Sequence, residues 1–521
     1  MRRTGWLGKR ATRLTSTDMM APVSEWGSEP GPPATHHPFV TESVPIPRGR
    51  DPLAFFGRIV VALVSGLVCT VAAIAITIGR IYEPAMAAST MTAEQWGPFT
   101  VLVSFDMPPV DVVVLSLLAI AVIACCAVGF EVVAALMTVS PRRAQLASLR
   151  RESVISIVDP PPIRITVLIP AHDEEVTLPV TLAALARQTR PPDRIIVIAD
   201  NCTDRTVAIA RDLGHEAFET VDNAHKKGGA LNQALGRLLP LCGSEDAVLV
   251  MDADTSLNEK FVETAARLLE QDSELAAVGG VFYGEPGFGL IGQFQRNEYT
   301  RYSLQIQARR GRVFVLTGTA TMFRATAMKD VAAARSVYIP GAPGQVYDTS
   351  ALTEDNELTL ALKSLGATMT SPPECTVVTE LMPNWRALWR QRQRWQRGAL
   401  ENLGAYGVTR ATIRYWGQQV GIGYGTFALN AALLLMLITA LSVDQWIWFA
   451  FWTVVGAIFL AERVITAWRA GWRGRLLAAT LIPELIYDVY LQAVFISCLF
   501  DIAVGRTATW GAMRRTAAKA A

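Results

Sequence analysis

Long uncharged stretches of apolar residues restrict the fold of this chain more than any other feature. The first stretch covers 59–79 and lies between Arg58 and Arg80. About 20 such residues cross a bilayer as one helix, so we expect a transmembrane helix here. A second uncharged run covers 112–130, and the two runs together predict two membrane spans within 51–141.

Three further apolar regions lie near the other end of the chain. Residues 416–443 form a third run, and 445–461 form a fourth run that is short and rich in Trp and Phe. In the region 476–505, acidic residues separate the apolar pieces. We therefore expect an interfacial or re-entrant helix near 476–490, followed by a span. The side of the membrane on which the basic tail 506–521 ends stays open.

The basic residues indicate how these spans are oriented. Residues 1–50 are basic, rich in Pro, Gly, Ser and Thr, and without an apolar period, which predicts a flexible tail. Arginines return after residue 141, whereas the loop between the first two runs contains acidic residues and no Lys or Arg. By the positive-inside rule, the N-terminal tail and the segment after 141 are cytoplasmic, and we expect the protein in the plasma membrane.

The composition is typical of a chain that is only partly embedded in a membrane. Hydrophobic residues make up 51% of the chain and charged residues 18%, which predicts a soluble domain between the spans. The net charge of +2 gives no reason to expect a nucleic acid as a partner. The seven cysteines are scattered and contain no Cys-x-x-Cys pair, which argues against a disulfide framework and against a structural zinc site.

Short β-rich runs alternate with helical patterns between residues 160 and 410. Strands are predicted at 163–169, 194–199 and 247–251, and helices at 178–188, 203–213, 227–239 and 259–271. This alternation is typical of βαβ units, so we expect an α/β domain with a mostly parallel, buried sheet. In such a sheet, functional residues cluster at the carboxyl ends of the strands.

Acidic residues follow the first two predicted strands. Glu174 comes shortly after the first strand, and Asp200 follows the second. A carboxylate at this edge can accept a hydrogen bond from the base or the ribose of a nucleotide, so both residues are candidates for donor binding. For Asp204, which precedes the next helix, a role as a helix cap is an equally good interpretation.

Lys227 opens a predicted helix within the sequence Lys-Lys-Gly-Gly. Paired glycines let the backbone approach a ligand closely, and the N-terminus of a helix favours anions. Lys227 is therefore a candidate for binding a diphosphate. The same pattern also occurs in ordinary turns, so it is a weak signal when it stands alone.

Asp252-Ala253-Asp254 directly follows a predicted buried strand, so we expect this motif at the edge of the sheet. Two carboxylates two residues apart can bind one hard cation together, with diphosphate oxygens and water as its other ligands. Such an ion would neutralise the charge that builds up on a departing nucleoside diphosphate. The alternative is a turn that contains two Asp residues.

Thr353-Glu354-Asp355 opens an amphipathic helix that we expect to run to Leu365. A carboxylate at this place can act as the general base that takes the proton from an attacking sugar hydroxyl. The alternative is purely structural, because Thr is a good N-cap and acidic residues stabilise the first turn of a helix.

Gln391-Arg392-Gln393-Arg394-Trp395 lies shortly before the third apolar run. Arginines suit contacts with a pyrophosphate and an indole can stack on a sugar face, so Gln391, Arg394 and Trp395 are candidates for the donor site. The alternative is a basic, aromatic helix at the membrane surface. Both interpretations can hold together, since a catalytic site at the membrane surface needs both properties.

Four of these motifs occur in the order found in a known family. Asp200, Asp252-Ala253-Asp254, Thr353-Glu354-Asp355 and the segment 391–395 resemble the motifs of processive, membrane-integrated family 2 glycosyltransferases. These include the cellulose, hyaluronan, chitin and poly-N-acetylglucosamine synthases. The resemblance covers about 163–400 by motif, and the flanking spans by layout.

The resemblance implies a GT-A fold and a nucleotide-sugar donor, usually linked to UDP. It implies a Mg²⁺ or Mn²⁺ ion at Asp254, with Asp252 close to the metal or the diphosphate. It also implies Asp355 as the catalytic base of an inverting reaction, with Arg394 and Trp395 near the pyrophosphate and the acceptor sugar.

A loop of small residues extends this resemblance to the acceptor. The stretch 316–320 is similar to the small-residue acceptor loop of the family, which lets the growing chain approach. Thr317, Gly318 and Thr319, together with Trp395, are therefore expected to bind the acceptor, which is either a growing glycan or a lipid.

The leading hypothesis is a synthase that transfers β-linked sugar on the cytoplasmic side and threads the polymer through its own spans. One alternative is non-processive transfer of a single sugar to a lipid. An alternative of another class is a non-catalytic membrane transporter or scaffold with a degenerate transferase domain. In each case the lipid bilayer is a partner.

These inferences combine into one domain map. We expect a flexible tail at 1–50, two spans within 51–141, a cytoplasmic GT-A catalytic domain at 142–383, interfacial helices with the Gln-x-x-Arg-Trp motif at 384–414, transmembrane and interfacial helices at 415–505, and a basic tail at 506–521.

Overall fold

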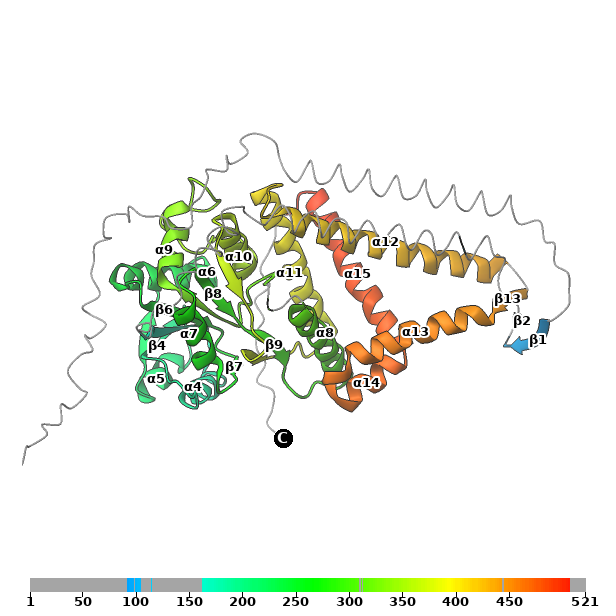
Figure 1. Cartoon of the computed structure of the whole chain (residues 1–521), viewed down its shortest axis with the longest axis horizontal. Coiled ribbons are helices and arrows are strands. Elements are labelled where there is room, and N and C mark those ends of the chain that lie inside the picture. Colours follow the sequence, from blue (N-terminus) through cyan, green and yellow to red (C-terminus); the bar gives the residue numbers. More distant parts are fainter. Residues whose placement is uncertain are drawn as a thin grey trace, which may run out of the picture.

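The computed structural model describes residues 91–97, 99–104, 114, 162–308, 311, 313–442 and 445–506. The predicted tail 1–50, the predicted span 59–79, nearly all of the predicted span 112–130 and the tail beyond Arg506 lie outside the described residues. The described part consists of an α/β domain and an arm of long helices (Figure 1).

A seven-stranded sheet forms the centre of the α/β domain. Its strand order is β11-β8-β10-β6-β3-β4-β5. The α/β class and the mostly parallel sheet are confirmed, except that β10 runs antiparallel to both of its neighbours and makes the sheet mixed. The strands are β3 (Arg164–Ala171), β4 (Arg194–Ala199), β5 (Glu216–Glu219), β6 (Asp246–Met251), β8 (Leu275–Gly279), β10 (Ala320–Arg324) and β11 (Thr368–Thr370).

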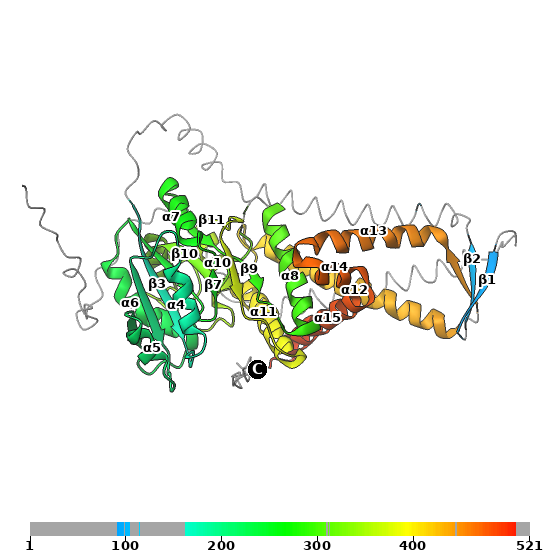
Figure 2. The same ribbon diagram turned by 90° about the horizontal axis from the view of Figure 1, so that it is seen from below.

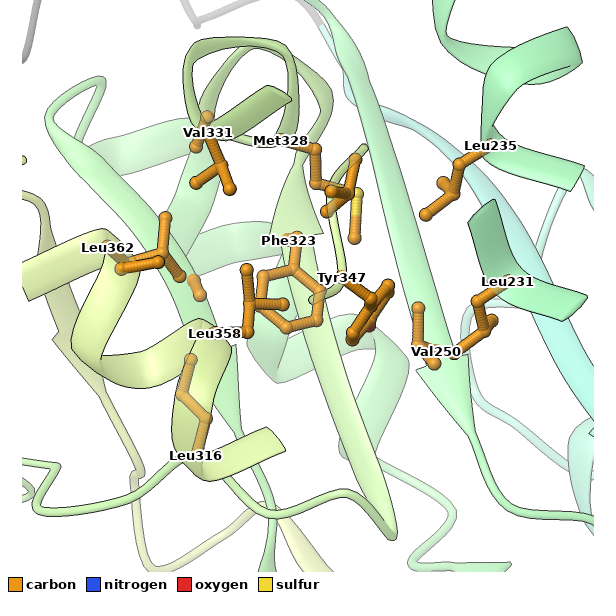
Figure 3. Packing of buried hydrophobic residues seen from close by; sticks show 14 of the residues in the cluster. Leu231, Leu235, Val250, Leu316, Phe323, Met328, Val331, Tyr347, Leu358 and Leu362 are labelled. Carbon is orange, nitrogen blue, oxygen red and sulfur yellow. The ribbon is translucent and has the colours of Figure 1, made fainter. Parts of the chain in front are cut away.

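Helices cover both faces of this sheet because its strands are apolar on both sides. In β6, Val248 and Val250 pack toward one face, whereas Leu249 and Met251 pack toward the other. Figure 3 shows Val250 facing Leu231 on the first face. The first face is covered by α6 (Lys226–Leu238), α9 (Ala325–Ala334) and α10 (Glu354–Ser364), and the second by α4 (Leu178–Ala186), α5 (Thr206–Asp212) and α7 (Phe261–Gln271).

Two polar helices and a small sheet join the α/β domain to the helical arm. The small sheet has the strand order β7-β12-β9. Figure 1 shows α8 and α11 between the α/β domain and the long helices. These elements are β7 (Ser256–Leu257), β9 (Val281–Gly284), β12 (Thr376–Thr379), α8 (Gly289–Ala308) and α11 (Trp385–Tyr406).

The arm consists of α12 (Ile413–Ser442) and α13 (Ala450–Thr466), which extend to a three-stranded sheet at its far end (Figures 1 and 2). That sheet has the order β1-β2-β13 and is made of β1 (Met91–Trp96), β2 (Phe99–Ser104) and β13 (Gln445–Phe449). The predicted third run corresponds to α12. The predicted fourth run differs, because its first five residues form β13, which pairs in parallel with β2. Aromatic and β-branched residues at this place suit a strand.

The last apolar region also differs from the prediction. A short helix, α14 (Gly471–Ala479), is followed by one continuous helix, α15 (Ile482–Ala503). The expected change from one helix to a separate span near residue 490 is therefore not found. The acidic residues do not break α15 because they form ion pairs: Glu484 with Arg301 at 2.7 Å and Asp488 with Arg463 at 2.6 Å. Among the described helices, 413–438 within α12 and the whole of α15 are long and apolar enough to cross a membrane, by length and composition alone.

A buried ion pair holds α10 in place. Arg335 follows α9, is fully buried, and donates a 2.8 Å hydrogen bond to Glu357 of α10. Arg335 also donates to the carbonyl of Val346, and the hydroxyl of Tyr406 in α11 donates to Glu357. This group therefore joins the loop after α9, the helix α10 and the helix α11.

Replacing Arg335 with Met is expected to destabilise the protein by about 3–5 kcal/mol, because Glu357 would stay buried without its cation. The matched control is Arg211→Met, which removes an ion pair with Glu219 whose side chains are 58% and 59% exposed. That exposed pair contributes about 0–1 kcal/mol. The measurement is the thermal unfolding midpoint of the purified chain, and equal midpoints for the two variants would contradict the prediction.

Candidate active site

The end of β6 and the start of β10 lie side by side at one edge of the central sheet. The pairing of β6 with β10 ends at Met251 and Ala320 and extends one residue further, because the Asp252 amide donates a 3.0 Å hydrogen bond to the carbonyl of Thr319. Because β10 is antiparallel, its first residues lie at the edge where β6 ends. The structure therefore brings the predicted metal motif and the predicted acceptor loop together.

Lys227 lies at the centre of this edge. Its ammonium group donates to Asp252 at 2.7 Å and to the carbonyl of Gly318 at 3.3 Å, and its Nζ lies 3.1 Å from a carboxylate oxygen of Glu354. Burial alone would lower the pKa of Lys227, but the nearby carboxylates of Asp252 and Glu354 outweigh burial and raise it. Lys227 is therefore a permanent cation that connects α6, β6 and α10.

Asp355 faces the same group from the first turn of α10. One of its oxygens accepts a 3.0 Å hydrogen bond from the Gly318 amide. Burial and the negative charge of Glu354 raise the pKa of Asp355 to about 6, although Lys227 acts in the opposite direction. A carboxylate with this pKa is ionised at neutral pH and can still accept a proton, which is what a general base requires.

Gly318 packs closely against two charged groups of the site. A methyl group on its Cα would lie 3.1 Å from a carboxylate oxygen of Asp355 and 3.3 Å from the Lys227 ammonium group. The side chain of any other residue would therefore push these two groups apart. A small cavity of about 20 Å³ lies at this place and is lined by Lys227, Gly318, Tyr347, Glu354 and Asp355, among others.

Tyr347 is a residue of this site that sequence reasoning missed. Its ring is buried in the apolar cluster of the first sheet face, where Figure 3 shows it between Val250 and Phe323. Its backbone amide donates to Asn232 and its carbonyl accepts from Asn232, which fixes it to α6. No local pattern in the sequence marks Tyr347, because it reaches the site through a loop that is held by the buried Arg335.

Thr353 does not act as the helix cap that its sequence position suggests. It occupies the N-cap position of α10, but its side chain makes no capping hydrogen bond. Instead its hydroxyl and its carbonyl each accept a 3.2 Å hydrogen bond from Asn402 of α11. Thr353 therefore ties the start of α10 to α11.

Arg394 of α11 acts on the same group through its charge. The pKa of Glu354 is lowered despite its burial, because the cations of Lys227 and Arg394 lie close to it. Desolvation and the charge of Arg394 also lower the pKa of Lys226. The cations Lys227 of α6 and Arg394 of α11 thus both act on the carboxylate of Glu354.

Gln391 and Trp395 are organised by Arg392, the residue of their motif that sequence analysis left without a role. Arg392 is buried, donates to Gln391 at 2.8 Å, and forms a 2.8 Å ion pair with Glu298 of α8. Its guanidinium lies 4.4 Å from the centre of the Trp395 ring. A guanidinium over an indole face is a favourable cation–π contact. Arg392 therefore fixes the orientation of the indole.

Asp200 and Glu174 lie at the ends of the neighbouring strands. Asp200 follows β4, is buried, and accepts hydrogen bonds from Asn223 at 2.7 Å and from Thr220 at 2.9 Å. Asn223 belongs to the turn that leads into α6, so Asp200 is connected to the segment that carries Lys227. Glu174 accepts a 2.5 Å hydrogen bond from Thr177.

Asp254 is half-buried in the turn after β6, and its carboxylate lies 3.5 Å from the hydroxyl of Thr255. Asp252 holds Lys227 with one oxygen, and the carboxylates of Asp252 and Asp254 both offer hard oxygen atoms as candidate ligands. This set fits the ligand preference of Mg²⁺ or Mn²⁺.

Among the described residues, one group of three potential ligands lies elsewhere. Single atoms of Asp173, Cys202 and Asp204 lie within 4.8 Å of one another. Asp173 accepts from the Thr203 amide, and Asp204 accepts from the amide of Thr206 in the first turn of α5, although the N-cap residue of this helix is Arg205. Burial raises the pKa of the Cys202 thiol, which keeps it protonated and makes it a poor ligand. We interpret this cluster as a hydrogen-bonded turn.

Comparison with known proteins identifies the domain. Residues 160–398 match the family model described as "Glycosyltransferase like family 2". These residues form a family 2 glycosyltransferase domain. The match and the mixed sheet support the expected GT-A-like fold, and they support the expected enzyme class, a glycosyltransferase.

Curated relatives share this domain. The chain is 31% identical over 247 residues to the "Probable glycosyltransferase YdaM" of Bacillus subtilis, covering 45% of this chain and 55% of the relative. It is 26% identical over 246 residues to the poly-beta-1,6-N-acetyl-D-glucosamine synthase of Staphylococcus epidermidis, covering 46% of this chain and 55% of the relative. The chain thus spans about half the length of the curated relatives it matches.

A solved structure with a similar outline is the mannosyltransferase PcManGT from Pyrobaculum calidifontis, described in complex with GDP-Man and Mn²⁺. The TM-score is 0.46 and the sequence identity is 16%, with 73% of this chain and 99% of the other chain covered.

The catalytic rate is expected to rise with pH through about 6, the pKa of Asp355, and to level off above it, because only the ionised carboxylate accepts a proton. The Glu354→Gln variant removes a charge that raises this pKa, so its acidic limb should move to lower pH. The control is Glu219→Gln on the exposed side of β5, which should leave the profile unchanged. A limb that stays at the same pH in Glu354→Gln would contradict this assignment.

Proposed function

We propose that this protein transfers a sugar from a nucleotide-sugar donor, with UDP as the expected nucleotide, to the end of a growing β-linked polysaccharide. The reaction takes place at the cytoplasmic face of the membrane and is coupled to translocation of the product. The observation that carries the proposal is the convergence of Asp355, Lys227 and Arg394 directly beside the helix that leads into the arm. The curated relatives named as polysaccharide synthases support the same class of product.

The reaction is a single displacement at the anomeric carbon. The acceptor hydroxyl oxygen bonds to that carbon while its proton passes to a carboxylate oxygen of Asp355. The bond between the carbon and the diphosphate oxygen breaks, and the nucleoside diphosphate leaves with the electron pair. Because attack and departure occur on opposite faces of the carbon, its configuration inverts. The charges of Lys227 and Arg394 stabilise the negative charge that develops on the leaving diphosphate.

Asp254 and Asp252 are the residues we propose as ligands of Mg²⁺ or Mn²⁺. When bound, such an ion supplies Lewis-acid stabilisation of the departing diphosphate. Asp252 has a second role, because its contact with Lys227 connects the metal-binding turn to the base-bearing helix α10. Asp200 and Glu174 are proposed to contact the nucleotide, on the same edge of the sheet.

The acceptor is proposed to enter from the side of the helical arm. A cavity of about 180 Å³ lies beside Asn356, the residue after the proposed base. Its lining combines amide side chains such as Gln396 and Gln419 with the rings of Tyr302 and Tyr415. Amides can bind sugar hydroxyls and aromatic rings can stack on sugar faces, which supports a path for the growing chain past Thr317–Thr319 and Trp395.

Membrane location is proposed from the surface of the arm. Leu434, Leu437, Leu441, Val454 and Phe459 of α12 and α13 are all at least half exposed. Exposure of these apolar side chains is unfavourable in water, whereas contact with lipid is favourable. The parallel pairing of β13 with β2 supports the same proposal, because it joins the segment before β13 to a segment that lies between the first two proposed spans.

Replacing Asp355 with Asn should lower sugar transfer by roughly 10²–10⁴-fold, which is the usual contribution of a general base. The control is Asp348→Asn, a carboxylate that accepts hydrogen bonds from the amide and the hydroxyl of Ser350 and should keep activity. Release of the nucleoside diphosphate from a panel of UDP-sugars provides the measurement. Wild-type turnover in Asp355→Asn would remove the base from the mechanism.

The size of the product tests processivity separately. Mass spectrometry of the wild-type reaction should show a polymer series. A single added hexose on a lipid would replace the polysaccharide proposal with single transfer.

Treatment with EDTA should abolish turnover, and added Mg²⁺ or Mn²⁺ should restore it. Asp254→Asn should weaken Mn²⁺ binding measured by calorimetry, whereas Asp204→Asn in the hydrogen-bonded turn should not. Unchanged turnover of the metal-stripped enzyme would exclude the metal, and weaker binding in Asp204→Asn alone would move the site to the other cluster.

A further inference from the structure

We propose that α15 does not cross the membrane but lies along its surface, with one apolar face on the lipid and both ends on the side of the catalytic domain. The inference rests on the membrane location proposed above. It concerns a helix that is long and apolar enough to span a bilayer.

The first observation is that α15 lies beside α11 along most of its length. The Tyr490 hydroxyl donates to the carbonyl of Trp385 at 2.7 Å, and Gln393 donates to Asp501 at 3.0 Å. Beyond the end of α15, the Arg397 guanidinium donates to the carbonyl of Arg506. The partners advance in the same direction on both helices, so α15 runs parallel to α11.

The second observation is that α11 cannot lie in the hydrocarbon core. Its sequence, Trp385–Tyr406, contains five arginines, and residues up to 398 belong to the matched transferase domain. Arginine at the centre of a membrane helix is strongly unfavourable. A helix that is paired with α11 over this length therefore stays at the level of the membrane surface.

The third observation is that the start of α15 is also bound to the catalytic side. Asn297 and Arg301 of α8 donate to the buried carboxylate of Glu484 at 2.9 and 2.7 Å. Tyr487 donates to Glu298 of α8 at 2.7 Å. A helix that crossed the bilayer would carry one of its ends to the opposite side, yet both ends of α15 contact helices of the catalytic side.

The exposed face of α15 identifies its partner. Ile482, Ile486, Ile496, Phe500 and Val504 are 66%, 64%, 50%, 56% and 52% exposed. Their spacing follows the turns of one helix, and they lie opposite the side that pairs with α8 and α11. A helix that is polar on one side and apolar on the other suits the boundary between headgroups and acyl chains.

The segment before α15 marks the same boundary. Trp468 in the turn η3 (Trp468–Ala470) and Trp472 in α14 are 54% and 67% exposed. The guanidinium groups of Arg475 and Arg473 lie 3.8 and 5.5 Å from the centres of these rings. Exposed Trp and Arg together are typical of the membrane–water interface, and the arginines complement anionic headgroups. The occupant of this surface is therefore the bilayer that α12 and α13 enter.

The arrangement in space agrees with this assignment. Figures 1 and 2 show α12 and α13 extending to the sheet of β1, β2 and β13, whereas α15 stays beside α8 and α11. The membrane-facing surface of the catalytic side thus includes α15, and Arg506, just beyond its end, is bound to α11 on that side.

The first experiment measures the side of the C-terminus. The full chain carries an epitope tag after Ala521, and sealed vesicles of both orientations are treated with protease. We expect the tag and the catalytic domain to be digested together in inside-out vesicles and protected together in right-side-out vesicles. Digestion of the tag in vesicles whose catalytic domain survives would overturn the inference.

The second experiment compares one substitution in two helices. Ile496→Lys should leave the carbonate-resistant membrane fraction within about twofold of wild type, because a surface lysine reaches water. The matched variant Leu434→Lys, at an exposed apolar position of α12, should lower that fraction about tenfold or more. An equal loss in both variants would show that α15 is a span.

The outcomes separate this inference from the proposed function. Extraction of the wild-type chain by carbonate would overturn both the membrane location and the position of α15. Retention in the membrane with the tag on the far side would overturn only the position of α15. Sugar transfer is measured on its own and decides neither result.

Discussion

The ammonium group of Lys227 holds together the three segments at the centre of the candidate site. It touches the end of β6, the loop before β10 and the first turn of α10 at the same time. A buried cation needs compensating charge, and this one has Asp252 and Glu354 in contact and Asp355 nearby. Burial and the negative charge of Glu354 raise the pKa of Asp355, so Asp355 is the carboxyl group that holds its proton more tightly. The same contact that assembles the site therefore also sets its acid–base chemistry.

Much of this arrangement could be read from the sequence because it depends on local patterns. Apolar runs of strand length followed by Asp200 or Asp252 predicted both the parallel strands and the edge where functional residues gather. The contact between the loop 317–319 and Asp252 could not be predicted from local patterns, because it depends on an antiparallel strand inserted into a mostly parallel sheet. Such a pairing joins distant segments and leaves no local periodicity.

Two other features were hidden for related reasons. Arg392 is one of several arginines in its helix, and only the packing of α8 shows that it is the buried one, held by Glu298. The segment Gln445–Phe449 was apolar enough to be taken for the start of a helix, because apolarity over a short run does not distinguish a strand from a helix. Its partner strand lies hundreds of residues earlier in the chain.

The parallel pairing of β13 with β2 has a consequence for how the chain is made. During synthesis, β1 and β2 leave the ribosome before the transferase domain, whereas β13 follows only after α12. One edge of β2 therefore stays without its partner while the whole α/β domain is synthesised and folds. The far sheet can therefore be completed only after the α/β domain between β2 and β13 in the sequence has been synthesised.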